Sequence, residues 1–287
     1  MGFDKEEKYD WNWFRSSINQ TARTIEPQIK QLLDFVSEVD LIVQQVVDRP
    51  TSYASERPQD YVVSILVVRS FRLFVSSMIL SLSGYADVVP NLKRSVMEIG
   101  LMLLNMSSNP VAVALGYMLH SVQEEIISME TELGRLNTKG GNALNLPRNL
   151  EEWKNFHSLL GDLAKDRGLI AEEIQRNFAR TSVRSLCREH ASEEYYLVNY
   201  KADSLFTHGL HACLGGLVED NPDQRTFMLG PAINHADAAV MDSIAQMTAN
   251  LALAGDILED EGVAQNAMSL CRRVENLITK SWSRMPE

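Results

Sequence analysis

The chain has 287 residues, of which 45% are hydrophobic and 23% are charged, and its formal net charge at neutral pH is −11. These values are ordinary for a folded globular protein, so disorder is not the expected state, and the length suffices for one large domain with an ample core. The acidic balance argues against a protein that coats nucleic acid, although it leaves room for a local basic patch.

The sequence favours a cytoplasmic protein with no membrane partner. Its three cysteines are far apart and form no CxxC pair, which fits a reducing compartment better than a disulfide framework. The polar, acidic N-terminus is not a secretory signal. The longest apolar stretch, residues 61–85, is interrupted by Arg69 and Arg72, so it predicts a buried helix and not a membrane span.

Nearly every segment shows the 3.6-residue period of an amphipathic helix. The first apolar stripe covers residues 29–46, and Pro27 either begins that helix or kinks a longer one that starts near Asp10. Gly84 is the predicted C′ glycine of the second helix, because glycine readily adopts the left-handed conformation found there.

The later helices also have boundary signals. Asn109 before Pro110 predicts an N-cap, and Asn149 with Glu152 is spaced like the capping box of a fifth helix. No stretch alternates as a strand over several runs, and residues 219–231 are predicted to form a loop. The expected helices lie near residues 29–46, 58–82, 88–106, 110–136, 150–166, 170–189, 193–214, 234–259 and 263–282.

These helices predict an all-α fold, a single bundle of eight or nine helices in one domain. Within it, residues 1–57 hold the first long helix, residues 58–215 form the core, and residues 216–287 contribute a C-terminal helical pair. We expect the protein to form a homo-oligomer through the apolar faces of its long helices.

A basic stripe lies within the helix predicted over residues 170–189. Residues four apart advance about 400° around a helix, so each side chain drifts only about 40° from the one before. The stripe therefore forms one basic ribbon that suits an acidic protein or RNA. Its members are Arg176, Arg180, Arg184 and Arg188.

The same stripe has a purely structural interpretation, in which its charges are neutralised within the protein. Glu172 precedes Arg176 by four residues, in the favourable order for a helical ion pair. The fourth helix could also lie alongside and supply carboxylates. Its acidic residues are Glu124, Glu125, Glu130 and Glu132.

Arg184 and His190 match the Rx4–6H pattern and in this resemble HEPN ribonucleases. The resemblance implies an all-helical dimer in which arginine and histidine activate the RNA 2′-hydroxyl and stabilise the cleaving phosphate without a metal. A chain of this composition contains about one such match by chance. Six positions on a continuous helix also place two side chains about 120° apart, so only a break near Arg188, or convergence across a dimer, would bring the pair together.

The segment YKADSLFTHGLH places Tyr200, Ser204, His208 and His211 on one helix face. Two histidines are too few to hold a metal, and no third ligand is identifiable, so no metal site is predicted. A nucleophile pair of Ser204 and His208 would lack an evident oxyanion hole. The favoured interpretation is a buried hydrogen-bonded network.

Arg94 and Glu98 lie four residues apart in the otherwise apolar segment NLKRSVMEIGLMLLNM. Burying either charge alone would cost on the order of 3–5 kcal/mol. We therefore expect the two side chains to pair with each other or with another polar group, either as structural glue or as the floor of a pocket.

The two polar segments carry a second resemblance. SLSGYADVVPNLKRSVMEIGLMLLNM and the Tyr-x-x-x-Ser-x-x-x-His segment are similar to those of a bacterial all-helical family, domain-of-unknown-function family 5677, over about residues 60–215. The resemblance implies an all-α fold and brings no activity. It also implies one shared polar cluster, formed by Arg94, Glu98, Tyr200, Ser204 and His208.

Two functions remain open at this point. The first is a non-catalytic binding or regulatory protein of a bacterial cell, with the polar cluster in its core and the basic face turned toward an acidic partner. The second is a metal-independent ribonuclease of HEPN type in a stress or phage-defence system, with Arg184, His190 and His208 as catalytic residues. No cofactor is expected, because neither a GxGxxG nor a GxxxxGK[ST] motif is present.

Overall fold

The computed structural model describes residues 11–52, 56–139, 145–191, 194, 197, 218–221, 224–227 and 236–282. Its long helices are α1 (Trp11–Val47), α2 (Pro58–Leu82), α3 (Val89–Ser108), α4 (Pro110–Lys139), α5 (Leu146–Asp166), α10 (Ala236–Leu258) and α11 (Glu261–Trp282). The shorter elements are the 3-10 turn η1 (Ala86–Val88), α6 (Ala171–Arg180), α7 (Val183–His190), β1 (Val218–Asn221) and β2 (Gln224–Phe227).

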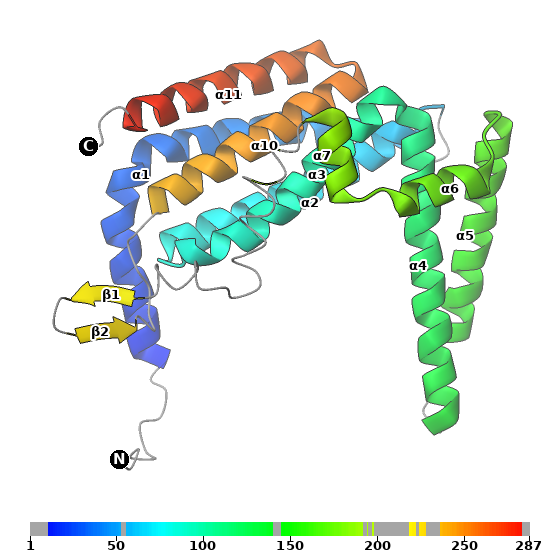
Figure 1. Ribbon diagram of the computed structural model, residues 1–287, viewed down its shortest axis with the longest axis horizontal. Helices are drawn as coiled ribbons and strands as arrows, with labels where there is room; N and C mark the ends of the chain where they lie inside the picture. The colour runs from blue at the N-terminus through cyan, green and yellow to red at the C-terminus, as the bar shows by residue number, and fades with distance from the viewer. Residues whose placement is uncertain are drawn as a thin grey trace.

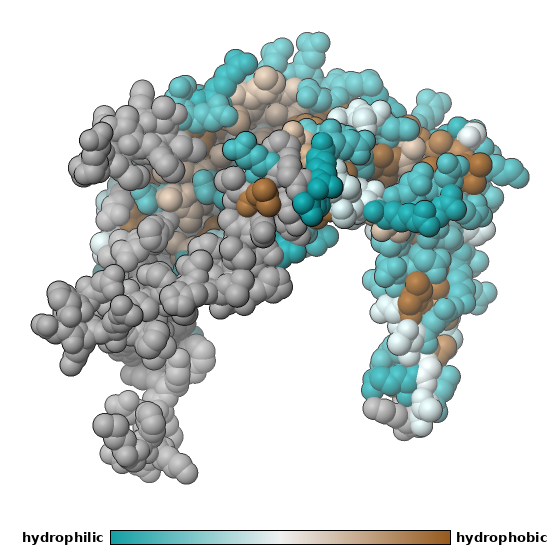
Figure 2. Space-filling model, viewed as in Figure 1, coloured by the Kyte–Doolittle hydropathy of each residue, from teal (hydrophilic) through white to brown (hydrophobic). Residues whose placement is uncertain are grey.

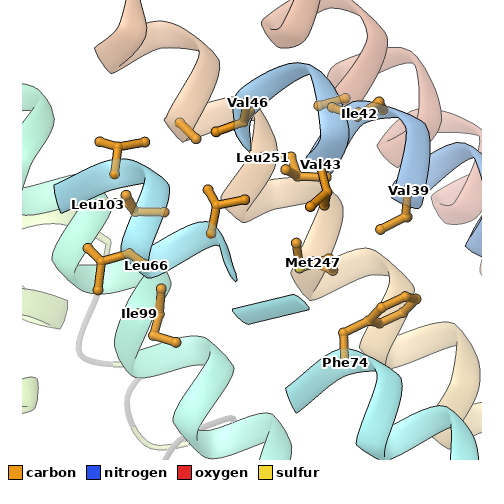
Figure 3. Close-up of a cluster of buried hydrophobic side chains, with 14 of the residues drawn as sticks. Val39, Ile42, Val43, Val46, Leu66, Phe74, Ile99, Leu103, Met247 and Leu251 are labelled. Atoms are coloured by element: carbon orange, nitrogen blue, oxygen red, sulfur yellow. The ribbon is translucent and has the colours of Figure 1, made fainter. Parts of the chain in front are cut away.

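Helix α10 lies at the centre of the core. It packs against α11, α2, α3 and α1, so elements from both ends of the chain meet on it (Figure 1). Met247 and Leu251 of α10 point into the apolar cluster that also receives Val43 from α1 and Phe74 from α2 (Figure 3). The predicted all-α fold is confirmed.

Helix α1 contains Pro27 in its interior, so the proline does not begin the helix. A proline there removes one intrahelical hydrogen bond and bends the helix. Figure 1 shows α1 bent along its length, as the second of the two predicted arrangements requires. The buried stripe that includes Ile29, Val39 and Val46 follows the predicted period.

The predicted bounds of α2 are confirmed. Pro58 occupies its first turn, and Gly84 follows its end with φ of +83°. The amide of Tyr85 donates to the Leu80 carbonyl at 2.8 Å, and the amide of Gly84 donates to the Ser81 carbonyl at 3.2 Å, which is the Schellman arrangement.

Helix α2 is long and apolar enough to cross a membrane by length and composition. One such helix is weak support for a membrane span, because the core helix of a soluble protein passes the same test. Here α2 packs against α10, α3, α1 and α4. Its buried side chains, such as Val63, Val67 and Phe74, belong to the main apolar core.

A buried polar group joins α10 to α2 and α3. The amide nitrogen of Asn250 donates to Ser70 Oγ and to the Val96 carbonyl, both at 3.0 Å. Gly100 makes room for this side chain, because a Cβ at that position would lie 2.4 Å from Asn250 Oδ1. Helices α2, α3 and α10 therefore pack closely around the side chain of Asn250, whose amide nitrogen is hydrogen-bonded within the protein.

The turn between α10 and α11 is a second Schellman motif, but Glu259 stands where glycine is usual, with φ of +56°. Arg57 holds this residue by an ion pair of 2.7 Å to Glu259 and donates to the Ile257 carbonyl at 3.0 Å. Arg49 pairs with Asp260 at 2.6 Å. Both cations lie at the C-terminal end of α10, where they complement the helix dipole.

Helices α4 and α5 form an arm that extends from the body (Figure 1). Trp153 and Phe156 pack edge to face on α5, and Lys154 pairs with Glu130 of α4 at 2.7 Å. Glycine at position 116 lets α6 lie against α4, because a Cβ there would stand 2.8 Å from the Ile174 carbonyl oxygen.

Three predicted elements differ from the structure. Helix α5 begins at Leu146 with Asn145 as N-cap, so the predicted capping box at Asn149 lies within the helix. The helix predicted over 170–189 is two helices, α6 and α7. Residues 219–231 hold most of the β1–β2 hairpin, in which Asn221 pairs with Gln224.

The helix predicted over 193–214 lies almost wholly outside the described residues.

Candidate functional site

A pocket of about 410 Å³ lies where the end of α3 and the start of α4 meet α6. Its apolar wall includes Val113, Leu169, Ile174 and Phe178. The polar part of the lining consists of Asn105, Asn109, Glu173, Asn177 and Thr181. A concave site with an apolar wall and a few polar groups is the usual form of a small-molecule site.

The position of α6 fixes one wall of this pocket. Ile174 and Phe178 lie four residues apart and face α4, and the Phe178 ring contacts Tyr117 edge to face at a centroid distance of 5.6 Å. The same ring lies 5.5 Å from the ring of His120. These contacts anchor α6 on α4 next to Gly116, so the polar residues of the same helix are held at the pocket.

The chain breaks its helix between Arg180 and Val183. Thr181 and Ser182 have extended backbones, and the Ser185 amide donates to Ser182 Oγ at 3.1 Å in a capping box that starts α7. The four stripe arginines therefore lie in pairs on two helices, and the predicted continuous ribbon over residues 170–189 is wrong. Figure 2 shows strongly hydrophilic side chains over both α6 and α7.

Arg176 and Arg180 of α6 are exposed. In the part of the chain that the structure describes, neither has a carboxylate within ion-pair distance, and the predicted pair between Glu172 and Arg176 does not form. On a helical wheel, Arg180 lies about 20° from Glu173, on the side away from the apolar wall. Both arginines thus lie on the side of α6 next to Glu173, outside the pocket lining.

Glu130 and Glu132 of α4 pair within the arm and not with the stripe. Glu130 pairs with Lys154 of α5, and Arg135 donates to Glu132 at 2.7 Å. The hydrogen bond from Arg135 lowers the pKa of Glu132. The carboxylates of Glu130 and Glu132 therefore both pair with cations of α4 and α5.

His190 reaches the pocket indirectly. Its Nε2 atom lies 3.4 Å from Asn105 Oδ1, and Asn105 lines the pocket. Helix α7 is held there by a small apolar cluster of Leu186 and Cys187 with Leu101 of α3. The histidine therefore restricts the side chain of a pocket residue.

Arg184 and His190 lie on the continuous helix α7, about 120° apart around its axis. The break that could have brought them together falls before Arg184, so it does not change their relative directions. Nothing in the described residues favours the HEPN-type ribonuclease.

Arg94 and Glu98 pair as expected, with Nε 3.3 Å from Oε1. Their side chains are 26% and 40% exposed, so the pair lies at the surface of α3 and does not fill the core. Next to it Lys93 pairs with Asp242 of α10 at 3.0 Å.

The other members of the predicted polar cluster, Tyr200, Ser204 and His208, lie outside the described residues, as does His211. In the described part of the chain, no three histidine, cysteine or carboxylate side chains gather as metal ligands would.

The sequence did not point to the pocket asparagines. Asn109 was predicted as an N-cap, and neither Asn105 nor Asn177 stood out, because amides are common on helix surfaces. One signal was present: the Gly116 position inside α4, where a conformationally permissive residue breaks a good helical pattern.

Residues 60–225 match the model of a family described as a family of unknown function, DUF5677. The match contains the whole pocket, the Arg94–Glu98 pair and α7. No curated protein and no solved structure matches the chain.

Proposed function

Because the chain belongs to the DUF5677 family, which brings no assigned activity, we propose a function from the site itself: a non-catalytic protein that binds a small polar ligand in the pocket between α3, α4 and α6. The observation that carries the proposal is the lining, in which Asn105, Asn109 and Asn177 meet an apolar wall. Each amide both donates and accepts hydrogen bonds, so the set suits hydroxyl, amide or carboxylate groups.

The charges around the pocket narrow the ligand class. Glu173 lines the pocket, while Arg176 and Arg180 lie beside Glu173 on α6, outside the lining, and have no partner among the described residues. A carboxylate with two nearby guanidinium groups complements a molecule that carries both a cationic and an anionic group. We therefore propose a small zwitterion, with its ammonium group at Glu173 and its anionic group at the arginines.

The experiment is a thermal-shift screen of the purified protein with amino acids, short peptides and their N-acetylated or amidated forms. A ligand is expected to raise Tm, and removal of either charge from it should abolish the shift. Asn177→Leu and Arg180→Gln should each lose the response. Asn155→Leu on the exposed face of α5 and Arg272→Gln on α11 are matched controls that should keep it.

Failure of every zwitterion to shift Tm, or equal responses from the Asn177 and Asn155 variants, would reject the pocket as the ligand site. RNA cleavage in EDTA that is lost in His190→Ala would instead identify a nuclease. On the proposed role, His190→Ala weakens ligand binding through Asn105 and yields no cleavage in either form.

We also propose that the basic residues of α6 and α7 recruit an acidic macromolecule, as the sequence suggested. Formation of a homo-oligomer is a further part of the proposal. Arg176 and Arg180 support the first of these, because both are exposed and neither has an ion-pair partner in the described part of the chain. Such an acidic partner would compete with the small ligand, since both use the same two arginines.

A further inference from the structure

One side of α2 carries a mainly apolar stripe at the edge of the core, in which Ile65, Arg72 and Ile79 are exposed and the other three members are half-buried. Its members follow one another by four, three, four, three and four residues, which is the spacing of the a and d positions in a coiled coil. Five of the six are apolar or aromatic, and Ile65 and Ile79 are 39% and 58% exposed. We refer to Tyr61, Ile65, Val68, Arg72, Val75 and Ile79 as the α2 stripe.

Part of the α2 stripe is hollowed. A groove of about 510 Å³ runs along Tyr61, Ile65 and Val68 and is bordered by Val47 at the end of α1. The arginines Arg69 and Arg72 close its other end. The groove is therefore apolar along its floor and cationic at one end.

The two arginines have no carboxylate of this protein within ion-pair distance among the described residues. Both are exposed, although the chain as a whole is strongly acidic, and Arg49 and Arg57 at the end of α10 are by contrast ion-paired. Two cations at an apolar seam, with no carboxylate partner in the described part of the chain, leave a local charge that another protein can neutralise.

We propose that the α2 stripe docks an amphipathic α-helix of another protein, one that carries carboxylates beside its apolar seam. The stripe covers 19 residues from Tyr61 to Ile79, whose 18 helical steps span about 27 Å, so a partner of about five turns would cover it. A compact small ligand would fill the groove and leave Ile79 bare.

The charges also decide between this partner and a second copy of the chain. In an antiparallel pairing of two α2 helices, Val68 would face Arg72 of the other copy, and four arginines would gather around the symmetry axis. The stripe itself supplies no carboxylate to offset them. An acidic helix removes this repulsion, so the chemistry of the stripe favours it.

The test uses fluorescence anisotropy with a labelled synthetic helix of about three heptads, leucine at a and d and glutamate at e and g. Its counterpart has lysine in place of glutamate. The full-length protein is expected to bind the glutamate peptide at least about tenfold more tightly, which corresponds to two partly exposed ion pairs. Since the net charge of −11 favours the lysine peptide, this preference can arise only from a local basic site.

The double variant Arg69→Glu, Arg72→Glu should reverse the preference, and Ile79→Asn should weaken binding of both peptides. Arg272→Glu and Leu159→Asn change the same properties on α11 and α5 and should have no effect. Because all these positions are exposed, circular dichroism should show unchanged folding.

Three results would overturn the proposal. Equal affinity for both peptides, or no binding of either, would exclude an acidic helix. A dimer in light scattering that Ile65→Asn dissociates would assign the stripe to a second copy. Arg72-dependent sedimentation with phosphatidylglycerol vesicles, without peptide binding, would assign it to a membrane surface.

Discussion

Asn250 has no solvent-accessible surface, and its amide is bound to two acceptors on neighbouring helices. We expect Asn250→Ala to lower the free energy of unfolding by about 2–4 kcal/mol, because it leaves a cavity and removes two buried hydrogen bonds between helices. Urea denaturation followed by circular dichroism measures this. Asn155→Ala on exposed α5 should change it by less than about 0.5 kcal/mol, and equal effects would refute the role of the buried amide.

Glu259 stores strain in a left-handed backbone conformation. Glu259→Gly should raise the free energy of unfolding by about 0.5–1 kcal/mol, since relief of the strain exceeds the loss of an exposed ion pair to Arg57. Glu259→Ala keeps the strain and loses the pair, so it should destabilise. Thermal melts of both variants are the measurement, and shifts of the same sign would contradict this account.

Burial raises the pKa of the Cys271 thiol. A raised thiol pKa means less thiolate at neutral pH, so the rate of alkylation by iodoacetamide should be low. This rate should still increase at pH values where the alkylation rate of glutathione has reached its plateau. Peptide-resolved mass spectrometry follows this cysteine separately from the others. A pH midpoint equal to that of glutathione would disprove the shielding.

Two glycines in helix interiors should respond oppositely to alanine. A Cβ at Gly255 would lie 2.5 Å from the backbone nitrogen of Ala264, so Gly255→Ala should push α11 away from α10 and destabilise the protein by about 2 kcal/mol. Nothing lies within 4 Å of a Cβ at Gly134 on α4.

Gly134→Ala should therefore stabilise by about 0.5–1 kcal/mol, through helix propensity alone. Urea denaturation of the two variants in parallel measures both effects. Loss of stability in both would show that the arm also packs at Gly134.

The sequence predicted the elements best where chemistry marks their ends. Pro58 and Gly84 marked the two ends of α2 in the sequence. Proline is preorganised for a first helical turn, and glycine readily adopts the left-handed backbone conformation that follows a helix. The break at Ser182 was missed because the apolar and basic period continues across it, and its capping partner is Ser185 where glutamate is the usual signal.

The candidate site was less predictable than the fold, since its residues are far apart in the sequence. Asn105 and Asn177 line the same pocket only because α6 packs on α4, and nothing local in either segment specifies that packing. Arg94 and Glu98 were predicted because their pairing is within one helix, although burial of the pair was not found.

The whole molecule divides into a dense body around α10 and an arm of α4 and α5. Hydrogen exchange should reflect this difference. The amides of α10 are expected to exchange most slowly, because this helix has buried side chains on most of its circumference. The distal part of the arm, near Arg135 and Arg148, should exchange fastest among the long helices, and equal protection of arm and body would contradict this picture.

The order in which the chain is made has a consequence for the central position of α10. Helices α2 and α3 are synthesised more than a hundred residues before the helix that covers them. Until α10 has been synthesised, Phe74, Ile99 and Leu103 cannot pack against it. The nascent chain therefore exposes a large apolar surface for most of its synthesis. We expect the protein to depend on chaperones during translation, even though the finished fold is compact around α10.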